Sequence, residues 1–212
     1  MFITFEAGEG AGKSTQARAL TEKLRELGHG VVLTREPGGS PLAESLRSLV
    51  VEGEPGRMDA ETELLIFTAA RRDHILRTIR PALAAGKIVV CDRYLGSTHA
   101  LQGAAGVSAQ TIDTLHKLFC NVTPDLTLYL DMDSKDGLER SLDRLAGEGA
   151  QESRFEAKGP AFHQIVQRSF RAQCAARPEW SAVDAIGTIP EVCARVLDIV
   201  LSNPKFPIRL SA

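Results

Sequence analysis

Residues 5–15 read Phe5-Glu6-Ala7-Gly8-Glu9-Gly10-Ala11-Gly12-Lys13-Ser14-Thr15, and this stretch decides the fold. An apolar run over residues 1–5 precedes it, and a pattern typical of a helix follows it. Small side chains let the backbone curl so that successive N–H groups point inward, where the dipole of the following helix also favours negative charge. The stretch therefore predicts a loop that binds a polyphosphate, between a strand and a helix. The residues expected to form it are Ala7, Gly8, Glu9, Gly10, Ala11, Gly12, Lys13, Ser14 and Thr15.

Two side chains of this loop suit a nucleotide and its metal ion. Lys13 would reach the β and γ phosphates as a mobile positive charge, and the Ser14 hydroxyl would complete the coordination shell of Mg²⁺. Ala7 stands where this motif usually has its first glycine. Because alanine is strained at positive φ, we expect Ala7 to keep an ordinary backbone conformation.

Length and composition narrow the class of protein. The chain has 212 residues, which predicts a single domain over residues 1–212. Its formal net charge of −2 gives no overall field for nucleic acid, although a local basic cleft can hold a small polyanion. The four cysteines lie far apart and the histidines are not clustered, so neither zinc nor a disulfide framework is indicated. No apolar run approaches the ~18 to 20 residues of a membrane span, and no basic leader begins the chain. We therefore expect a soluble cytoplasmic protein with small-molecule partners, and no nucleic acid or membrane partner.

Apolar strands alternate with helical patterns along the chain. Strands are predicted at 2–6, 31–34, 88–91, 126–130 and 182–186, and helices at 12–28, 41–50, 59–80, 108–120, 134–146, 160–176 and 190–202. Ser40 and Asp59 are expected to cap the second and third helices, and Pro81 is expected to stop the third. A short helix should follow and end at Gly86. This alternation predicts a three-layer α/β fold. The stretch 147–159 has no periodicity, which predicts a mobile lid between two helices.

Polar residues stand where the predicted strands end: Glu6, Arg35, Glu36, Asp92, Arg93 and Asp131. Ligands of open parallel sheets bind beyond the carboxyl ends of the strands, so these residues predict one crevice. Asp92 follows an apolar strand, as a carboxylate that holds Mg²⁺ or its water, or that accepts a proton from the phosphate acceptor, would do. The alternative for Asp92 is an ion pair or a cap at a strand end. For Asp131 the favoured interpretation is a turn or helix-cap residue.

The third predicted helix carries Phe67, Arg71 and His74 on one face, because these residues are spaced by four and three positions. An aromatic ring and an arginine suit a planar base. The alternative places Phe67 in the core and Arg71 in a surface salt bridge. His74 is interpreted as structural rather than catalytic.

Three arginines flank the predicted lid, namely Arg140, Arg144 and Arg154. An arginine delivered by a closing segment would neutralise charge on a transferring phosphoryl group. A solvated helix face explains Arg140 and Arg144 almost equally well. Arg154 lies inside the polar stretch itself and is the stronger candidate for a catalytic residue.

Four segments together resemble bacterial thymidylate kinase: Thr34-Arg35-Glu36-Pro37-Gly38-Gly39, Phe67-x-x-x-Arg71, Asp92-Arg93-Tyr94 and Pro124-Asp125-Leu126-Thr127-Leu128-Tyr129-Leu130-Asp131. The similarity covers about residues 2–200. It implies transfer of the γ-phosphoryl group of ATP to dTMP, giving dTDP, with Mg²⁺. The fold implied is the nucleoside-monophosphate-kinase type of P-loop domain, with a five-stranded parallel sheet, helices on both faces and a lid. A homodimer built from helices is also implied.

The resemblance assigns roles to matching residues of this chain. Phe67 would stack on thymine, Arg71 would hydrogen-bond the pyrimidine edge, and Arg93 would grip the 5′-phosphate of the acceptor. Glu9 matches the position that addresses the deoxyribose 3′-hydroxyl, or nearby solvent and metal. The lid would supply Arg154, because the loop itself contains no arginine. The full set implied for the acceptor is Glu9, Arg35, Glu36, Phe67, Arg71, Arg93, Ser97, Thr98 and Gln102, with Lys13, Asp92, Arg93 and Arg154 as catalytic residues and Ser14 and Asp92 as metal ligands.

The sequence departs from the family pattern at three positions. Ala7 replaces the first glycine of the loop, and Ser153 stands where an aspartate often precedes the lid arginine. Leu101 occupies a position where the family usually has a tyrosine under the sugar. We therefore predict weakened discrimination against a 2′-hydroxyl on the acceptor.

Other P-loop proteins fit the sequence less well. A GTP switch would need an Asn-Lys-x-Asp segment, but the asparagines are only Asn121 and Asn203. An ATP-driven transport subunit would need a Leu-Ser-Gly-Gly-Gln stretch, which does not occur. The serious alternative is a P-loop kinase for another nucleoside monophosphate or small acceptor.

Overall fold

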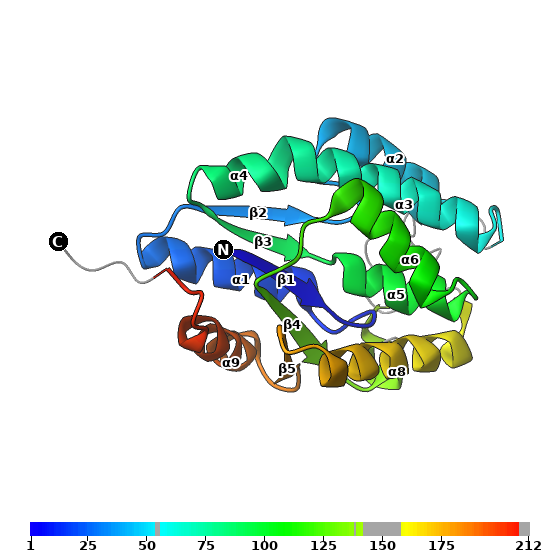
Figure 1. The fold of residues 1–212 in the computed structure, drawn as a ribbon. Helices are drawn as coiled ribbons and strands as arrows, with labels where there is room; N and C mark the ends of the chain where they lie inside the picture. The colour runs from blue at the N-terminus through cyan, green and yellow to red at the C-terminus, as the bar shows by residue number, and fades with distance from the viewer. Residues whose placement is uncertain (54–55, 138, 142–157, 208–212) are drawn as a thin grey trace.

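One parallel sheet organises the computed structural model, which describes residues 1–53, 56–137, 139–141 and 158–207 (Figure 1). Its strands are β1 Phe2–Glu6, β2 Val31–Arg35, β3 Ile88–Asp92, β4 Leu126–Asp131 and β5 Trp180–Asp184. They lie side by side in the order β2-β3-β1-β4-β5, and every neighbouring pair is parallel. The five-stranded parallel sheet expected from the family resemblance is confirmed.

The fifth strand begins two residues earlier than the predicted range of 182–186. Trp180 opens the strand and pairs with Thr127, and its ring is buried. The apolar pair at 185–186 lies beyond the last strand residue, and Ile186 is exposed. Counting Ile186 as a strand residue was therefore wrong.

Helices connect the strands: α1 Lys13–Glu26, α2 Pro41–Val51, α3 Ala60–His74, α4 Arg80–Ala84, α5 Leu95–Ala104, α6 Ala109–Leu115, α8 Pro160–Ala176 and α9 Ile189–Ser202. Two turns are π-helical, η1 Ile75–Ile79 and η2 His116–Cys120. Residues 134–137 and 139–141 are also helical. The remainder of the helix predicted at 134–146 lies outside the described residues.

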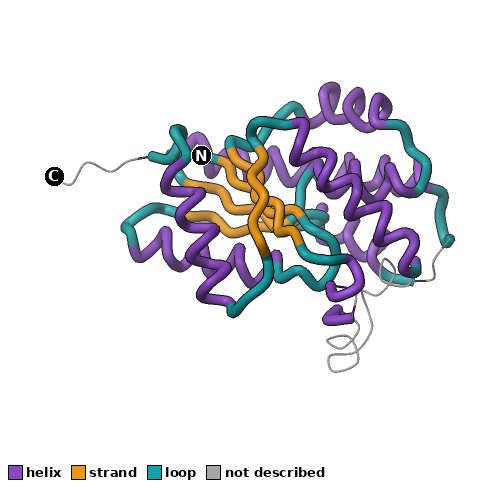
Figure 2. The backbone as a smooth tube through the Cα atoms, turned by 90° about the horizontal axis from the view of Figure 1, so that it is seen from below, coloured by secondary structure: helices purple, strands orange, loops and turns teal. Residues whose placement is uncertain are grey.

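These helices cover both faces of the sheet (Figures 1 and 2). On one face, α1 and α9 bury an apolar core that includes Ile3, Phe5, Leu20, Leu24 and Val196. On the other, η1 and α4 cover the β3 side and α8 covers the β4 and β5 side. The predicted three-layer α/β arrangement is confirmed, and it leaves the carboxyl ends of the strands as the place where loops converge.

The prediction that Pro81 stops the third helix was wrong. The helix continues from α3 through η1 into α4, because the π-helical turn changes the hydrogen-bond register before the proline. The Arg80 N–H group donates to the Ile75 carbonyl, and Pro81 then falls in the first turn of α4, where its missing N–H is tolerated. Asp59 caps α3 as predicted, by accepting from the Thr62 N–H at 2.8 Å.

Two smaller expectations also need correction. Ser40 precedes α2, but its hydroxyl donates to Asp73 Oδ2 at 2.6 Å instead of capping the helix. Helix α5 was not predicted, because Leu95–Ala104 is built of small and polar residues with little apolar periodicity. Within the described ranges, no helix is both long and apolar enough to cross a membrane.

Candidate active site

The loop after β1 has the backbone that its glycines predict. Gly10 and Gly12 adopt φ of 68° and 82°, and Gly12 is the N-cap of α1. Ala7 is not among the residues at positive φ, so the expectation for Ala7 is confirmed. A Cβ atom on Gly10 would lie 1.8 Å from the Gly137 carbonyl oxygen, so the segment after β4 packs directly on the loop. The two backbones can approach this closely only because Gly10 has no side chain.

Lys13 is held inside the loop. Its ammonium group donates to the Gly8 carbonyl at 2.6 Å, and the side chain is buried. Burial lowers the pKa of Lys13 to about 8, helped by the positive charge of Arg93 and opposed by the carboxylates of Glu9 and Asp92. A phosphate beside it would offset this desolvation and favour the charged ammonium.

Asp92 and Ser14 meet at the end of β3. The Ser14 hydroxyl donates to Asp92 Oδ2, and the other carboxylate oxygen, Oδ1, is buried with no hydrogen-bond partner among the described residues. A buried carboxylate oxygen without a donor is unfavourable unless a cation or water reaches it. The part of the chain that the structure describes holds no group of three or more acidic, histidine or cysteine side chains placed to bind a metal ion by themselves. One carboxylate and one hydroxyl nevertheless fit Mg²⁺, which keeps several waters and takes further oxygens from phosphates.

Arg93 lies between the loop and α5, in the left-handed region at φ 69°. Its guanidinium donates to Glu9 Oε1 at 2.6 Å, to the Ala7 carbonyl at 3.1 Å and to Ser97 Oγ at 3.0 Å. Its charged donors therefore lie directly beside the loop.

Glu6, the last residue of β1, is buried beneath Arg93. One carboxylate oxygen accepts from the Tyr94 N–H at 3.0 Å and the other from the Ser97 hydroxyl at 2.5 Å. Burial raises the pKa of Glu6, and its hydrogen bonds and the charge of Arg93 oppose this shift.

Arg71 forms a buried ion pair that the sequence did not reveal. Its Nε donates to Glu36 Oε2 at 2.7 Å, and its NH2 donates to Thr98 Oγ1 at 2.9 Å. His74 Nδ1 donates to the second Glu36 oxygen at 3.0 Å, while its Nε2 contacts Thr34 Oγ1 at 2.7 Å. Burial opposes ionisation of Glu36, but the charge of Arg71 and the two hydrogen bonds outweigh it and lower the pKa. The alternative of a surface salt bridge for Arg71 is wrong, and His74 has the structural position expected for it.

Helices α3 and α5 face each other around these groups. Phe67 belongs to an apolar cluster with Leu101, Ala100 and Trp180, and 7% of its surface is exposed. Gln102 donates to Glu63 Oε1 at 2.7 Å, one helical turn before Phe67. The structure therefore brings the predicted Phe67, Arg71, Thr98 and Gln102 to one interface between the two helices.

Some predicted residues lie apart from this interface. Arg35 is about half exposed and pairs with Glu44 at 3.0 Å. Asp131 pairs with Arg171 at 3.0 Å and accepts from the Tyr129 hydroxyl, so its interpretation as a turn or helix-cap residue was wrong. Arg140 is exposed, whereas Arg144, Arg154 and most of the predicted lid, 147–157, lie outside the described residues.

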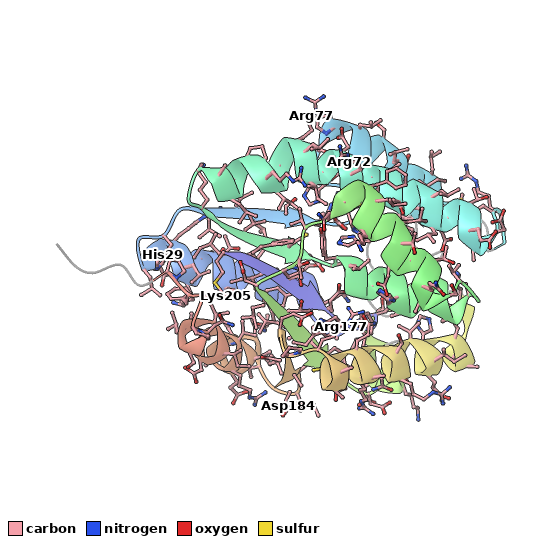
Figure 3. All side chains as sticks on the ribbon, in the orientation of Figure 1. His29, Arg72, Arg77, Arg177, Asp184 and Lys205 are labelled. Carbon is pink, nitrogen blue, oxygen red and sulfur yellow. The ribbon has the colours of Figure 1, made fainter. Side chains whose placement is uncertain are left out.

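The cluster occupies one end of the sheet. Figure 3 shows His29 and Lys205 at the opposite end, where the strands begin, and Arg77 on the outer side of the helical layer over β2 and β3. Glu63 and Gly137 also contact residues of the site, and neither was predicted to do so. The signal available for Gly137 was a glycine shortly after a strand-end aspartate, whereas the contact of Glu63 with Gln102 has no local signature.

The strand order, and the glycine-rich loop at the end of the central strand, place the protein among the P-loop kinases of the nucleoside-monophosphate type. The sequence model of the family "Thymidylate kinase" matches residues 5–196. A thymidylate kinase from Ruegeria pomeroyi is 50% identical over 207 residues, which cover 96% of this chain and 95% of that protein. One from Caulobacter vibrioides is 46% identical over 95% of this chain and 96% of that protein.

A solved structure agrees with these sequences. The crystal structure of thymidylate kinase from Ehrlichia chaffeensis aligns with a TM-score of 0.76 at 33% identity, covering 94% of this chain and 97% of that one. The chain belongs to the thymidylate kinase family.

Proposed function

We propose that this protein transfers the γ-phosphoryl group of ATP to dTMP, giving dTDP for the synthesis of dTTP. The observation that supports this most strongly is the family match, because it extends over residues 5–196 and so includes the loop, the α3 residues and Arg93. The geometry supports it, since the glycine-rich loop, Arg93 and the interface of α3 with α5 share the carboxyl end of one sheet.

The donor half of the proposed site is the loop Ala7 to Thr15, whose inward N–H groups would hold the phosphates of ATP. Lys13 would exchange its bond to the Gly8 carbonyl for the β and γ phosphates. Mg²⁺ would be held by Ser14 and Asp92, whose Oδ1 has no hydrogen-bond partner among the described residues. The ion supplies charge neutralisation when bound; the residues themselves position the phosphates.

The acceptor half is proposed to lie between α3 and α5. Arg93 would bind the 5′-phosphate of dTMP, with Glu9 beside the deoxyribose and Ser97 orienting the guanidinium. Phe67 would stack on thymine. Arg71 is held through its Nε and NH2 groups, so its remaining N–H groups can meet the pyrimidine edge.

The rest of the acceptor set serves the same pocket in this proposal. Glu36 would fix the position of Arg71, and Thr98 and Gln102 would line the pocket from α5. Arg35 would act from the rim of the site. Arg154 is proposed to reach the transferring phosphoryl group from the lid, and Asp92 to serve as base or metal anchor.

We also propose a single domain and a cytoplasmic homodimer. Helix α3 packs against η2, and the two expose Leu65, Leu118 and Phe119 at 57%, 68% and 50% of their surface. Large apolar side chains gathered on packed helices favour association with a second copy. Sedimentation analysis should show a dimer that Leu118→Arg converts to a monomer.

The decisive assay is ADP release from MgATP with a panel of nucleoside monophosphates, including dTMP, dUMP, UMP, CMP and AMP. We expect the highest kcat/KM with dTMP, and loss of at least about two orders of magnitude in Lys13→Ala, since that side chain contacts the transferring charge. Turnover of another monophosphate with none of dTMP would replace this proposal by the alternative of a kinase for a different acceptor.

A further inference from the structure

Glu6 is a buried carboxylate that the proposed chemistry does not use. It ends the central strand, directly before the loop, and only 1% of its surface is exposed. A carboxylate in such a place is costly unless donors satisfy it, and burial raises the pKa of Glu6. Its partners therefore indicate what the residue is for.

Both partners belong to the segment that carries Arg93. Glu6 Oε1 accepts from the Tyr94 N–H at 3.0 Å, immediately after the arginine. Arg93 itself has φ 69°, a left-handed conformation that is unfavourable for an L-residue with a side chain. The bond from the adjacent N–H to Glu6 holds the backbone in this unfavourable turn.

The second carboxylate oxygen acts on the arginine side chain through a serine. The Ser97 hydroxyl donates its single hydrogen to Glu6 Oε2 at 2.5 Å, which leaves the oxygen lone pairs of Ser97 for Arg93 NH1 at 3.0 Å. If the hydroxyl hydrogen pointed the other way, it would face the guanidinium donors. Glu6 thus sets the direction of the hydroxyl that holds Arg93.

The start of α5 packs closely against the Glu6 carboxylate. A Cβ atom on Gly96 would lie 2.8 Å from Glu6 Oε1 and 2.6 Å from the Trp180 ring, so the start of α5 can approach Glu6 only with glycine at this position. The chain therefore keeps a carboxylate, a glycine and a serine together around one arginine.

We propose that Glu6 is a positioning residue that fixes both the backbone and the guanidinium of Arg93 in the orientation that binds the phosphate of the acceptor nucleotide. This inference rests on the proposed function, in which Arg93 grips the 5′-phosphate of dTMP. Glu6 does not touch the substrate itself.

The test uses Glu6→Gln, which keeps the shape of the side chain. A glutamine amide has one acceptor oxygen, so its NH₂ group must face either the Tyr94 N–H, where two donors would meet, or the Ser97 oxygen, to which it would donate, turning the hydroxyl hydrogen toward Arg93. We expect the dissociation constant for dTMP, measured by calorimetry, to rise at least about tenfold, the size of one hydrogen bond to a charged group. The dissociation constants for ATP and for thymidine should change less than about twofold, because neither ligand presents the 5′-phosphate that Arg93 is proposed to bind.

Two further variants keep the test decisive. Ser97→Ala removes the hydroxyl that links Glu6 to Arg93 and should weaken the binding of dTMP but not of thymidine. This variant tests the proposal even if Glu6→Gln does not fold. The matched control is Thr4→Val, on the same strand as Glu6, which removes the buried 2.9 Å hydrogen bond between Thr4 and Thr127 of β4. It should lower stability and leave all three dissociation constants unchanged.

The outcomes separate the two proposals. Equal losses for dTMP and thymidine, or unchanged dTMP binding in both Glu6→Gln and Ser97→Ala, would overturn the role of Glu6 while wild-type dTMP binding stands. A wild-type protein that binds no dTMP would instead refute the proposed function and this inference with it.

Discussion

Replacing Glu36 with glutamine tests how much the buried pair with Arg71 contributes to stability. Glu36 and Arg71 are each 4% exposed, and His74 is fully buried. A glutamine oxygen can still accept from Arg71 Nε. The amide NH₂ can donate to His74 Nδ1 if the imidazole proton moves to Nε2, where it would be donated to Thr34. The hydrogen bonds therefore survive, and the change removes mainly the negative charge.

The expected loss follows from leaving the Arg71 charge uncompensated. Two charges about 4 Å apart at an effective dielectric constant of about 20 attract each other by about 4 kcal/mol. Removing one partner of a buried pair costs about 3 to 5 kcal/mol. We therefore expect Glu36→Gln to lower the free energy of unfolding by about that amount. The double variant Glu36→Gln/Arg71→Met removes both charges and should cost less than the single variant.

Urea unfolding followed by circular dichroism measures these differences. Glu44→Gln is the control, because Glu44 pairs with Arg35 at the surface and its loss should cost less than about 1 kcal/mol. The folded pKa of Glu36 is below its ordinary value of 4.5, so its stabilisation is present above pH 4.5 and is lost as pH falls through the folded pKa. The gap between wild type and Glu36→Gln should close over that range. A gap under about 1 kcal/mol at neutral pH would refute the reasoning.

Three further predictions concern the site. The pKa of Lys13 is about 8 in the free protein, and a bound phosphate should raise it, so ATP binding above pH 8 should take up a proton. Calorimetry in buffers of different ionisation enthalpy measures this uptake. A proton uptake that does not change between pH 6 and 9 would contradict the prediction. Gly137→Ala places a Cβ atom 2.4 Å from the Glu9 carbonyl oxygen and should weaken ATP binding several-fold. Gly103→Ala is the control, because a Cβ atom there meets no atom within 4 Å, and it should leave ATP binding unchanged. Equal effects in the two variants would contradict the importance of the contact with the loop. Leu101→Tyr should raise the ratio of kcat/KM for dTMP over ribo-TMP, and an unchanged ratio would count against a role of position 101 in sugar selection.

The sheet and the loop could be predicted from the sequence because their signals are local. Each buried parallel strand is a short apolar run, and the loop has its glycines at fixed spacing. Local signals also misled the prediction at two places. A proline usually ends a helix. Here the π-helical turn places Pro81 in the first turn of α4, where its missing N–H is tolerated. Helix α5 lacks an apolar stripe because it lies between α3 and α8, and its small polar residues face the site.

Contacts between distant residues account for what the sequence could not show. The spacing on α3 placed Phe67 and Arg71 on one face, but nothing local indicates that Arg71 meets Glu36 at a separation of 35 residues. The same holds for Ser97 and Glu6, 91 residues apart. Each pair joins a strand end to a helix from elsewhere in the chain, Glu36 after β2 to Arg71 of α3 and Glu6 of β1 to Ser97 of α5, so it forms only once the helices pack on the sheet.

The most direct measurement is a crystal structure with dTMP and a non-hydrolysable ATP analogue bound together. We predict one pocket in which the triphosphate lies on the loop around Lys13 and the dTMP phosphate lies on Arg93. The thymine ring should stack on Phe67, with its edge on Arg71. Thymine bound elsewhere, with Phe67 and Arg71 out of contact with it, would contradict the assignment of dTMP as the acceptor.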